Sequence, residues 1–205
     1  MRTLVISDLH LAARTGRDVL RHEHPRSVLI QALGGVDRLV LLGDVLELRQ
    51  GPVHEALTTA EPALREIGDA LAGREVVLVA GNHDHHLVAP WFDRRFSLVV
   101  ESGPLGLESR VDPEPTDALA ALAGMLEPAA VRVAYPGVWL REDVYATHGH
   151  YLDRHTTVPA FERIAAGAMA RVVCEAPGGP RRAEDYEAVL SPMYAWIHAI
   201  AQTGL

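Results

Sequence analysis

Seven side chains able to bind metal or move protons lie at the ends of four apolar segments of the sequence. They are Asp8, His10, Asp44, Asn82, His83, Asp84 and His148. Carboxylate oxygens, amide oxygens and neutral imidazole nitrogens are hard to borderline ligands, which suit Mn, Fe, Zn or Mg. If the segments end at one place in the fold, these residues predict a site for divalent cations.

The apolar segments have the length and composition of buried strands. They cover residues 3–7, 39–42, 75–80 and 144–147. Runs without polar alternation are typical of strands that are covered on both faces, as in a parallel sheet. Apolar residues at spacings of three and four predict a helix over residues 54–72, and a shorter helix is expected over residues 26–33. The pattern indicates repeated strand-helix-strand units, and thus an α/β fold.

Parallel strands present their carboxyl ends at one edge of a sheet, where open α/β sheets bind ligands. Asp8 and His10 are two residues apart, so both side chains can point to the same side of an extended segment. Asp44 arrives from the strand expected at the centre of the sheet. It is the candidate for a carboxylate shared between two cations, which would lower the repulsion between them.

The pattern is less regular beyond residue 85. Residues 96–100 suggest a strand, and Thr116 is a suitable N-cap for a following helix. Residues 131–135 and 138–141 flank Pro136 and Gly137, which predicts a hairpin with its turn at these two residues.

Two helices are expected near the C-terminus. One begins at Pro159, and the other covers residues 183–203 with a break at Pro192. The apolar face of the last helix is expected to lack a partner within the chain, so an oligomer formed through this helix is one interpretation. Residues 1–205 are expected to form one domain, in which residues 156–205 are a helical C-terminal segment or insertion.

The composition of the chain limits the classes of function that it can have. A formal net charge of −8 argues against a broad nucleic-acid surface, because phosphate backbones are bound mainly by clustered basic residues. A small anionic substrate stays possible because bound cations reverse the local field. The single cysteine excludes an internal disulfide. No apolar run is long enough to span a bilayer, and the N-terminus lacks the pattern of a signal peptide, so the cytoplasm is the expected location.

Four motifs in this order resemble those of the calcineurin-like metallophosphoesterase family. Asp8 and His10 resemble its D-x-H motif, Gly43-Asp44 with Glu47 resembles G-D-x-x-[DE], and residues 81–84 resemble G-N-H-[DE]. His148 resembles the histidine of the fourth motif, which also follows a strand. The resemblance covers residues 1 to about 155. It implies the layered α/β/β/α sandwich of this family and hydrolysis of a phosphoester or pyrophosphate bond in a small phosphorylated substrate.

The resemblance also implies a set of metal ligands. Asp8 and His10 would bind a first cation, Asn82 and His148 a second, and Asp44 both. Mn is the expected metal, with Fe, Zn or Mg as alternatives.

Two further residues are implied to be catalytic. His83 would protonate the leaving oxygen, and Asp84 would fix the His83 ring. A metal-activated water would attack phosphorus in line.

The family's closing G-H-x-H motif is not found after His150. Residues 148–150 have the H-x-H spacing and could be that motif, but Thr147 precedes His148 where the motif has glycine. Residues 151–155 resemble phosphoesterases similar to the UDP-2,3-diacylglucosamine hydrolases, which favours the fourth-motif interpretation. The chain is then expected to stop before the last strands of the fold. A non-catalytic interaction module with an incomplete metal site is the alternative function.

Overall fold

The structure, a computed structural model, describes residues 1–97, 103–151, 168–169, 171–172 and 182–203. A mixed sheet with the strand order β1-β2-β3-β5-β4 lies at its centre. The strands are β1 (Thr3–Ile6), β2 (Arg38–Leu42), β3 (Glu75–Val79), β4 (Glu108–Arg110) and β5 (Ala130–Arg141). The pairings β1 to β2, β2 to β3 and β3 to β5 are parallel, and β4 pairs with β5 antiparallel. The predicted α/β fold is therefore confirmed.

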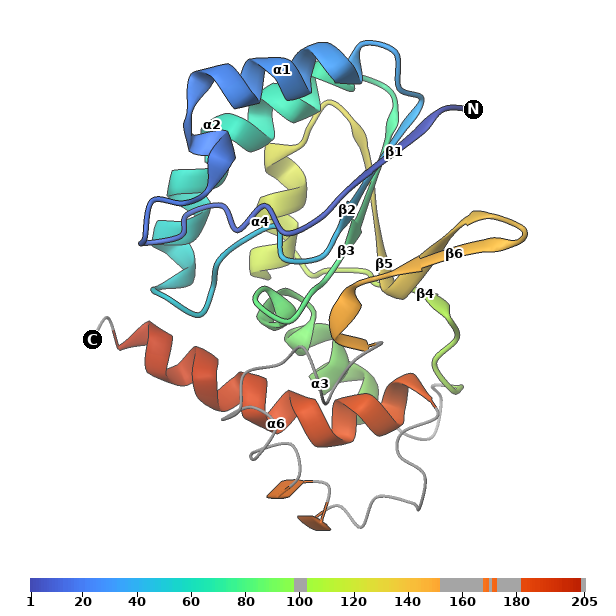
Figure 1. The fold of residues 1–205 in the computed structure, drawn as a ribbon. Helices are drawn as coiled ribbons and strands as arrows, with labels where there is room; N and C mark the ends of the chain where they lie inside the picture. The colour runs from blue at the N-terminus through green and yellow to red at the C-terminus, as the bar shows by residue number, and fades with distance from the viewer. Residues whose placement is uncertain (98–102, 152–167, 170, 173–181, 204–205) are drawn as a thin grey trace.

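Helices cover one face of the sheet (Figure 1). They are α1 (Glu23–Leu33), α2 (Val53–Ala70) and α4 (Ala118–Met125). Alternate residues of the central strands, such as Leu39, Leu41, Val76 and Leu78, belong to the large apolar cluster on this face. The predicted helix over residues 54–72 agrees with α2, whereas α1 begins three residues earlier than residue 26. The N-cap of α4 is Asp117, not the predicted Thr116.

The other face is covered by β strands from the same chain. Strand β6 (Val144–Thr147) pairs antiparallel with the second half of β5. Val138 of β5 packs there with Val40 and Val77, and Ala146 of β6 packs against the same cluster. The central strands are thus buried on both faces, which is why their sequences read as continuous apolar runs.

The predicted hairpin turn at Pro136 and Gly137 is wrong. Strand β5 runs without interruption from Ala130 to Arg141, and the chain turns after it, between Arg141 and Val144. Proline is tolerated at this point because the parallel pairing with β3 ends at Ala134, so β3 needs no N–H from residue 136. A Cβ on Gly137 would overlap the carbonyl of Ala146, so this close approach of β6 requires glycine.

The last helix packs across the loops that follow the sheet. Helix α6 (Ala183–Gln202) contacts the short 3-10 helix η2 (His85–Leu87), which also contacts α3 (Ala89–Ser97). Leu190 and Met193 are buried, so the prediction that this face lacks a partner within the chain is wrong for these two residues, whereas Trp196 and Ile200 of the same face are exposed. The predicted break at Pro192 is also wrong, because α6 continues through it.

Several predictions fall on parts of the chain outside the described residues. They concern residues 98–100 of the suggested strand, the helix expected from Pro159, and residues 152–155 of the fourth-motif segment. Phe96 and Ser97, the first residues of that suggested strand, belong to helix α3 instead. Within the described residues, no helix is both long enough and apolar enough to cross a bilayer.

Candidate metal centre

Parallel pairing continues beyond the ends of β1 and β2 into the loops that carry the predicted ligands. The N–H of Asp8 donates to the carbonyl of Gly43 (3.1 Å), and the N–H of His10 donates to that of Asp44 (2.9 Å). The N–H of Leu11 donates to Val45 in the same way (2.9 Å). These bonds hold the two loops side by side, so the side chains of both reach the same edge of the sheet.

Four donor atoms converge at this edge. They are Asp8 Oδ1, His10 Nε2, Asp44 Oδ2 and His148 Nε2. His10 Nε2 lies 3.8 Å from the Asp8 oxygen and 3.7 Å from the Asp44 oxygen. His148 Nε2 lies 3.7 Å and 3.6 Å from the same two oxygens. The structure therefore brings together predicted ligands from three separate segments.

The spacing of the donors of Asp8, Asp44 and His148 fits a divalent cation. Separations of this size are too long for hydrogen bonds, so the donors face one another without being bonded. Ligands at about 2.0–2.2 Å around a tetrahedral cation are themselves about 3.3–3.6 Å apart, close to the spacing found here. Asp44 and His148 are buried, whereas 58% of the Asp8 side chain is exposed, so the group is open to solvent on the Asp8 side.

Asp44 also belongs to a second group of possible ligands. Among the described residues, Asp8, Asp44 and His148 form one group of nearby donors, and His10, Asp44 and His83 form another. A carboxylate common to both groups is the arrangement expected of a shared ligand. The resemblance paired His148 with Asn82, but the neighbours that the structure gives to His148 Nε2 are Asp8 and Asp44.

Glycines make this convergence possible. Gly43 has a φ of +83°, and a Cβ there would overlap the ring of His148. A Cβ on Gly81 would overlap the carboxylate of Asp44. Larger residues would push the donor groups apart, so the glycines that precede Asp44 and Asn82 have a direct steric role.

The backbone is strained where the donors lie. Asp8, His10 and Asp44 adopt the left-handed conformation, with φ values of 56°, 43° and 53°. Such values are uncommon for residues other than glycine and cost free energy. The bonds between the two loops hold the backbone there, which fixes the direction of the side chains before any ligand arrives.

Asn82 lies next to the shared carboxylate. One atom of its side-chain amide is 3.3 Å from Asp44 Oδ2, and the other is 3.2 Å from Nη2 of Arg49. An amide nitrogen facing Asp44 would donate a hydrogen bond, whereas an amide oxygen facing it would share a cation with it. Arg49 also donates its Nε–H to the backbone carbonyl of Asn82 (3.1 Å), a contact that sequence reasoning did not identify.

His83 is oriented by Glu47. The Nδ1 atom of His83 lies 2.8 Å from Oε2 of Glu47, and the His10 ring meets the His83 ring edge to face. Burial lowers the pKa of His83, but the bond to Glu47 and the charges of Asp44 and Glu47 together outweigh it, so the pKa is raised. Burial raises the pKa of Glu47, yet the bond from His83 and the histidine charge leave this pKa below its ordinary value.

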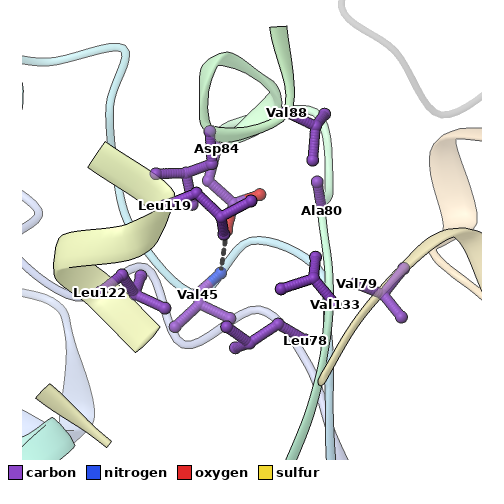
Figure 2. A pocket seen from close by; sticks show the side chains of 10 residues that line it. Val45, Leu78, Val79, Ala80, Asp84, Val88, Leu119, Leu122 and Val133 are labelled. Carbon is purple, nitrogen blue, oxygen red and sulfur yellow. Dashed lines mark hydrogen bonds between the residues drawn. The ribbon is translucent and has the colours of Figure 1, made fainter. Parts of the chain in front are cut away.

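The implied role of Asp84 is wrong. Its carboxylate does not hold the His83 ring but accepts backbone N–H groups from Gly81 (2.7 Å), Val45 (2.7 Å), Asp44 (3.3 Å) and Leu46 (3.3 Å). Figure 2 shows the bond to Val45 beside a small apolar pocket that Asp84 helps to line. Burial and then the charge of Asp44 raise the pKa of Asp84, although the backbone donors oppose this. Asp84 therefore joins the loop after β2 to the loop after β3.

His150 contacts His148 and not the converging donors. The two Nδ1 atoms lie 2.8 Å apart, and both rings are buried. His150 also packs against Tyr151, with ring centroids 3.8 Å apart. Its contacts place it behind His148, which favours a supporting role for this residue.

Helix α6 is linked to the same region by residues that sequence reasoning missed. Glu187 accepts a hydrogen bond from the hydroxyl of Tyr135, and its Oε2 lies 2.8 Å from Nε2 of His85. Arg49 lies over the ring of Tyr194, 5.2 Å from its centroid. His85 and Glu187 are 102 positions apart in sequence, so no local pattern could have paired them.

A pocket of about 350 Å³ lies beside the donors. Asp8, His10, Glu47 and His83 line it, and the segment after β1 contributes Ala13, Thr15, Arg17, Asp18 and Val19. A small substrate can therefore reach both the candidate ligands and the candidate proton donor.

A comparison with protein families agrees with this geometry. A family model described as calcineurin-like phosphoesterase matches residues 1–172 of the chain. No curated protein and no solved structure matches it.

Proposed function

Because the chain belongs to the calcineurin-like phosphoesterase family, we propose that it is a metal-dependent hydrolase of phosphoester or pyrophosphate bonds in small phosphorylated substrates. The convergence of four oxygen and nitrogen donors at one edge of the sheet is the observation that supports this most directly. These atoms lie too far apart to hydrogen-bond one another, and divalent cations bound among them would satisfy their free lone pairs.

Asp8, Asp44 and His148 would hold one cation, and His10 would bind a second one together with Asp44. Asn82, whose amide adjoins Asp44, would serve this second cation, which shares the Asp44 carboxylate, with Mn as the expected metal. When bound, such cations supply a water of lowered pKa and stabilise negative charge on the phosphoryl oxygens.

His83 would donate a proton to the leaving oxygen. Its Nδ1 is engaged by Glu47, so Nε2 is the ring atom left to give a proton. The raised pKa keeps the imidazolium form available near neutral pH, which a general acid requires. Glu47 would act by orienting the ring and stabilising its charge, in the role that the resemblance gave to Asp84.

Within this class we propose a phosphodiesterase or a nucleotide-linked pyrophosphohydrolase in preference to a nuclease. The formal charge of −8 disfavours a long nucleic-acid path, whereas the pocket beside His10 and His83 suits a small molecule.

The test is hydrolysis of bis(4-nitrophenyl) phosphate with added Mn by the native chain and by Asp44→Asn. This variant keeps the size of the side chain but removes its charge, so kcat/KM should fall at least about 100-fold. Asp143→Asn, on an exposed residue of the turn after β5, is the matched control and should retain the native rate. A metal-dependent rate equal in all three proteins, or none in the native chain, would contradict the proposal and favour an interaction module.

A further inference from the structure

The loop that follows β1 carries three arginines, and only one of them lines the pocket beside the candidate metal centre. Arg14 is paired with Glu55 (3.2 Å), and Arg21 is paired with Asp18 (2.9 Å). Arg17 lies between them in sequence, is exposed, and lines the pocket. Among the described residues, no carboxylate lies within ion-pair distance of Arg17.

The loop holds Arg17 at a defined place. Asp18 is buried, and its Oδ2 accepts the backbone N–H of Ala12 (3.0 Å). Arg21 donates to the carbonyl of Ala13 (3.1 Å), and the backbone N–H of Arg14 donates to Gln50 (2.9 Å). Residues on both sides of Arg17 are thus tied to the body of the protein, so the backbone of Arg17 is held beside the pocket.

The acidic residues of the pocket are already engaged. Glu47 is bonded to His83, and Asp18 is bonded within its own loop. Asp8 faces the converging metal donors. Arg17 is the one lysine or arginine among the residues that line this pocket. In a chain with a formal charge of −8, a cationic side chain placed there favours a negatively charged ligand.

We propose that Arg17 determines specificity by binding a second anionic group of the substrate, beyond the phosphate that is cleaved. The inference depends on the proposed function, because the cleaved phosphate must lie at the metal centre while the rest of the substrate extends toward Arg17. The second group is a phosphate or a carboxylate, since a guanidinium binds both with two parallel hydrogen bonds. Arg17 does not strengthen the binding of phosphodiesters that lack such a group.

The experiment compares the native chain with Arg17→Ala, Arg17→Lys and the control Arg65→Ala, which removes an exposed arginine of α2. The substrates are bis(4-nitrophenyl) phosphate, which carries one anionic group, and ADP-ribose, which carries two linked phosphates. Arg17→Ala should raise KM for ADP-ribose about tenfold, leave kcat within about twofold, and change neither value for the aryl diester. Arg17→Lys should recover part of the loss, and Arg65→Ala should behave as native.

Binding by calorimetry separates this inference from the proposed function. ADP, AMP and succinate are titrated into the native chain and Arg17→Ala with Mg present. We expect native affinity for ADP to exceed that for AMP, with Arg17→Ala losing this difference. If Arg17→Ala also binds succinate more weakly than the native chain does, a carboxylate is identified as the second group. If neither substrate is hydrolysed but the ADP preference depends on Arg17, the hydrolase fails and the binding role stands. Equal effects of Arg17→Ala on both substrates, or no effect on ADP affinity, would overturn the inference.

Discussion

The carboxylate of Glu47 fixes the imidazole of His83, with Oε2 of Glu47 lying 2.8 Å from Nδ1 of His83. Glu47 is buried, and 27% of the His83 side chain is exposed toward the pocket. This arrangement gives the ring a defined tautomer and a raised pKa while leaving its other nitrogen accessible.

Replacing Glu47 by Gln should slow the chemical step. Glutamine keeps the size of the side chain but removes the charge that stabilises the imidazolium, so kcat should fall about 10- to 100-fold with little change in KM. Steady-state kinetics on bis(4-nitrophenyl) phosphate measure both values. Glu55→Gln, on an exposed acid of α2, is the control.

The same variant should alter the pH dependence. His83 must be protonated to act as an acid, so the rate is lost as pH rises through its pKa. Without the charge of Glu47 this pKa falls, because that charge helps to raise it. The alkaline limb of the kcat profile should therefore move to lower pH in Glu47→Gln. An unchanged limb would exclude His83 as the group that titrates there.

His150 should set the proton position on His148. For Nε2 of His148 to bind a cation, its Nδ1 must carry a hydrogen, which His150 Nδ1 can accept at 2.8 Å. His150→Asn offers an oxygen near the same place, whereas His150→Leu offers none. Calorimetric titration with Mn should show affinity about 10-fold weaker for the leucine variant and near native for the asparagine variant. Equal losses in both would indicate a packing role alone.

Asp84 should matter more for stability than for proton transfer. Its carboxylate accepts four backbone N–H groups from the loops after β2 and β3. Asp84→Ala would leave these buried donors without a partner. The free energy of unfolding in urea should fall by about 2–4 kcal/mol, with a smaller loss for Asp84→Asn. Asp112→Ala, at an exposed acid, should have no comparable effect. A native stability in Asp84→Ala would contradict this role.

Acid should loosen the contact between η2 and α6. The rings of His86 and His198 are stacked with centroids 3.4 Å apart, and burial, followed by the charge of His198, lowers the pKa of His86 to about 4. The folded state then resists protonation that the unfolded state accepts near pH 6.5. Neutral His86 therefore contributes to the free energy of unfolding. This contribution is complete above about pH 6.5 and is lost as pH falls toward 4.

Allowing for the partial exposure of His86, the loss should amount to about 1–2 kcal/mol. Urea unfolding at pH 7.5 and pH 4.5 measures it. His86→Phe keeps a ring against His198 but cannot titrate, so its stability should change less between the two pH values than that of the native chain. The same change in both proteins would assign the pH dependence to other groups.

The sequence predicted the strand ends well because the governing signals are local. Apolar runs defined β1, β2 and β3, and the polar residues directly after them reach one edge of the sheet as expected. Asp8, His10, Asp44 and His148 were found this way. Whether all of them bind metal stays a prediction.

The errors concern contacts between segments distant in sequence. Asp84 adjoins His83 in sequence, but the carboxylate that reaches Nδ1 of the ring belongs to Glu47, which lies 36 positions away. Proline and glycine at residues 136 and 137 suggested a turn, but β5 changes partners there without turning. Helix α6 packs against η2, where Glu187 contacts His85. The periodicity of apolar residues within α6 does not identify such a distant partner.

Anomalous diffraction from crystals grown with Mn tests the central claim most directly. The account predicts a Mn peak about 2.0–2.3 Å from carboxylate oxygens of Asp8 and Asp44 and from Nε2 of His148. That peak should be absent from crystals of Asp44→Asn grown in the same way. Native crystals with no Mn peak among these three residues, or with Mn bound only elsewhere, would contradict it.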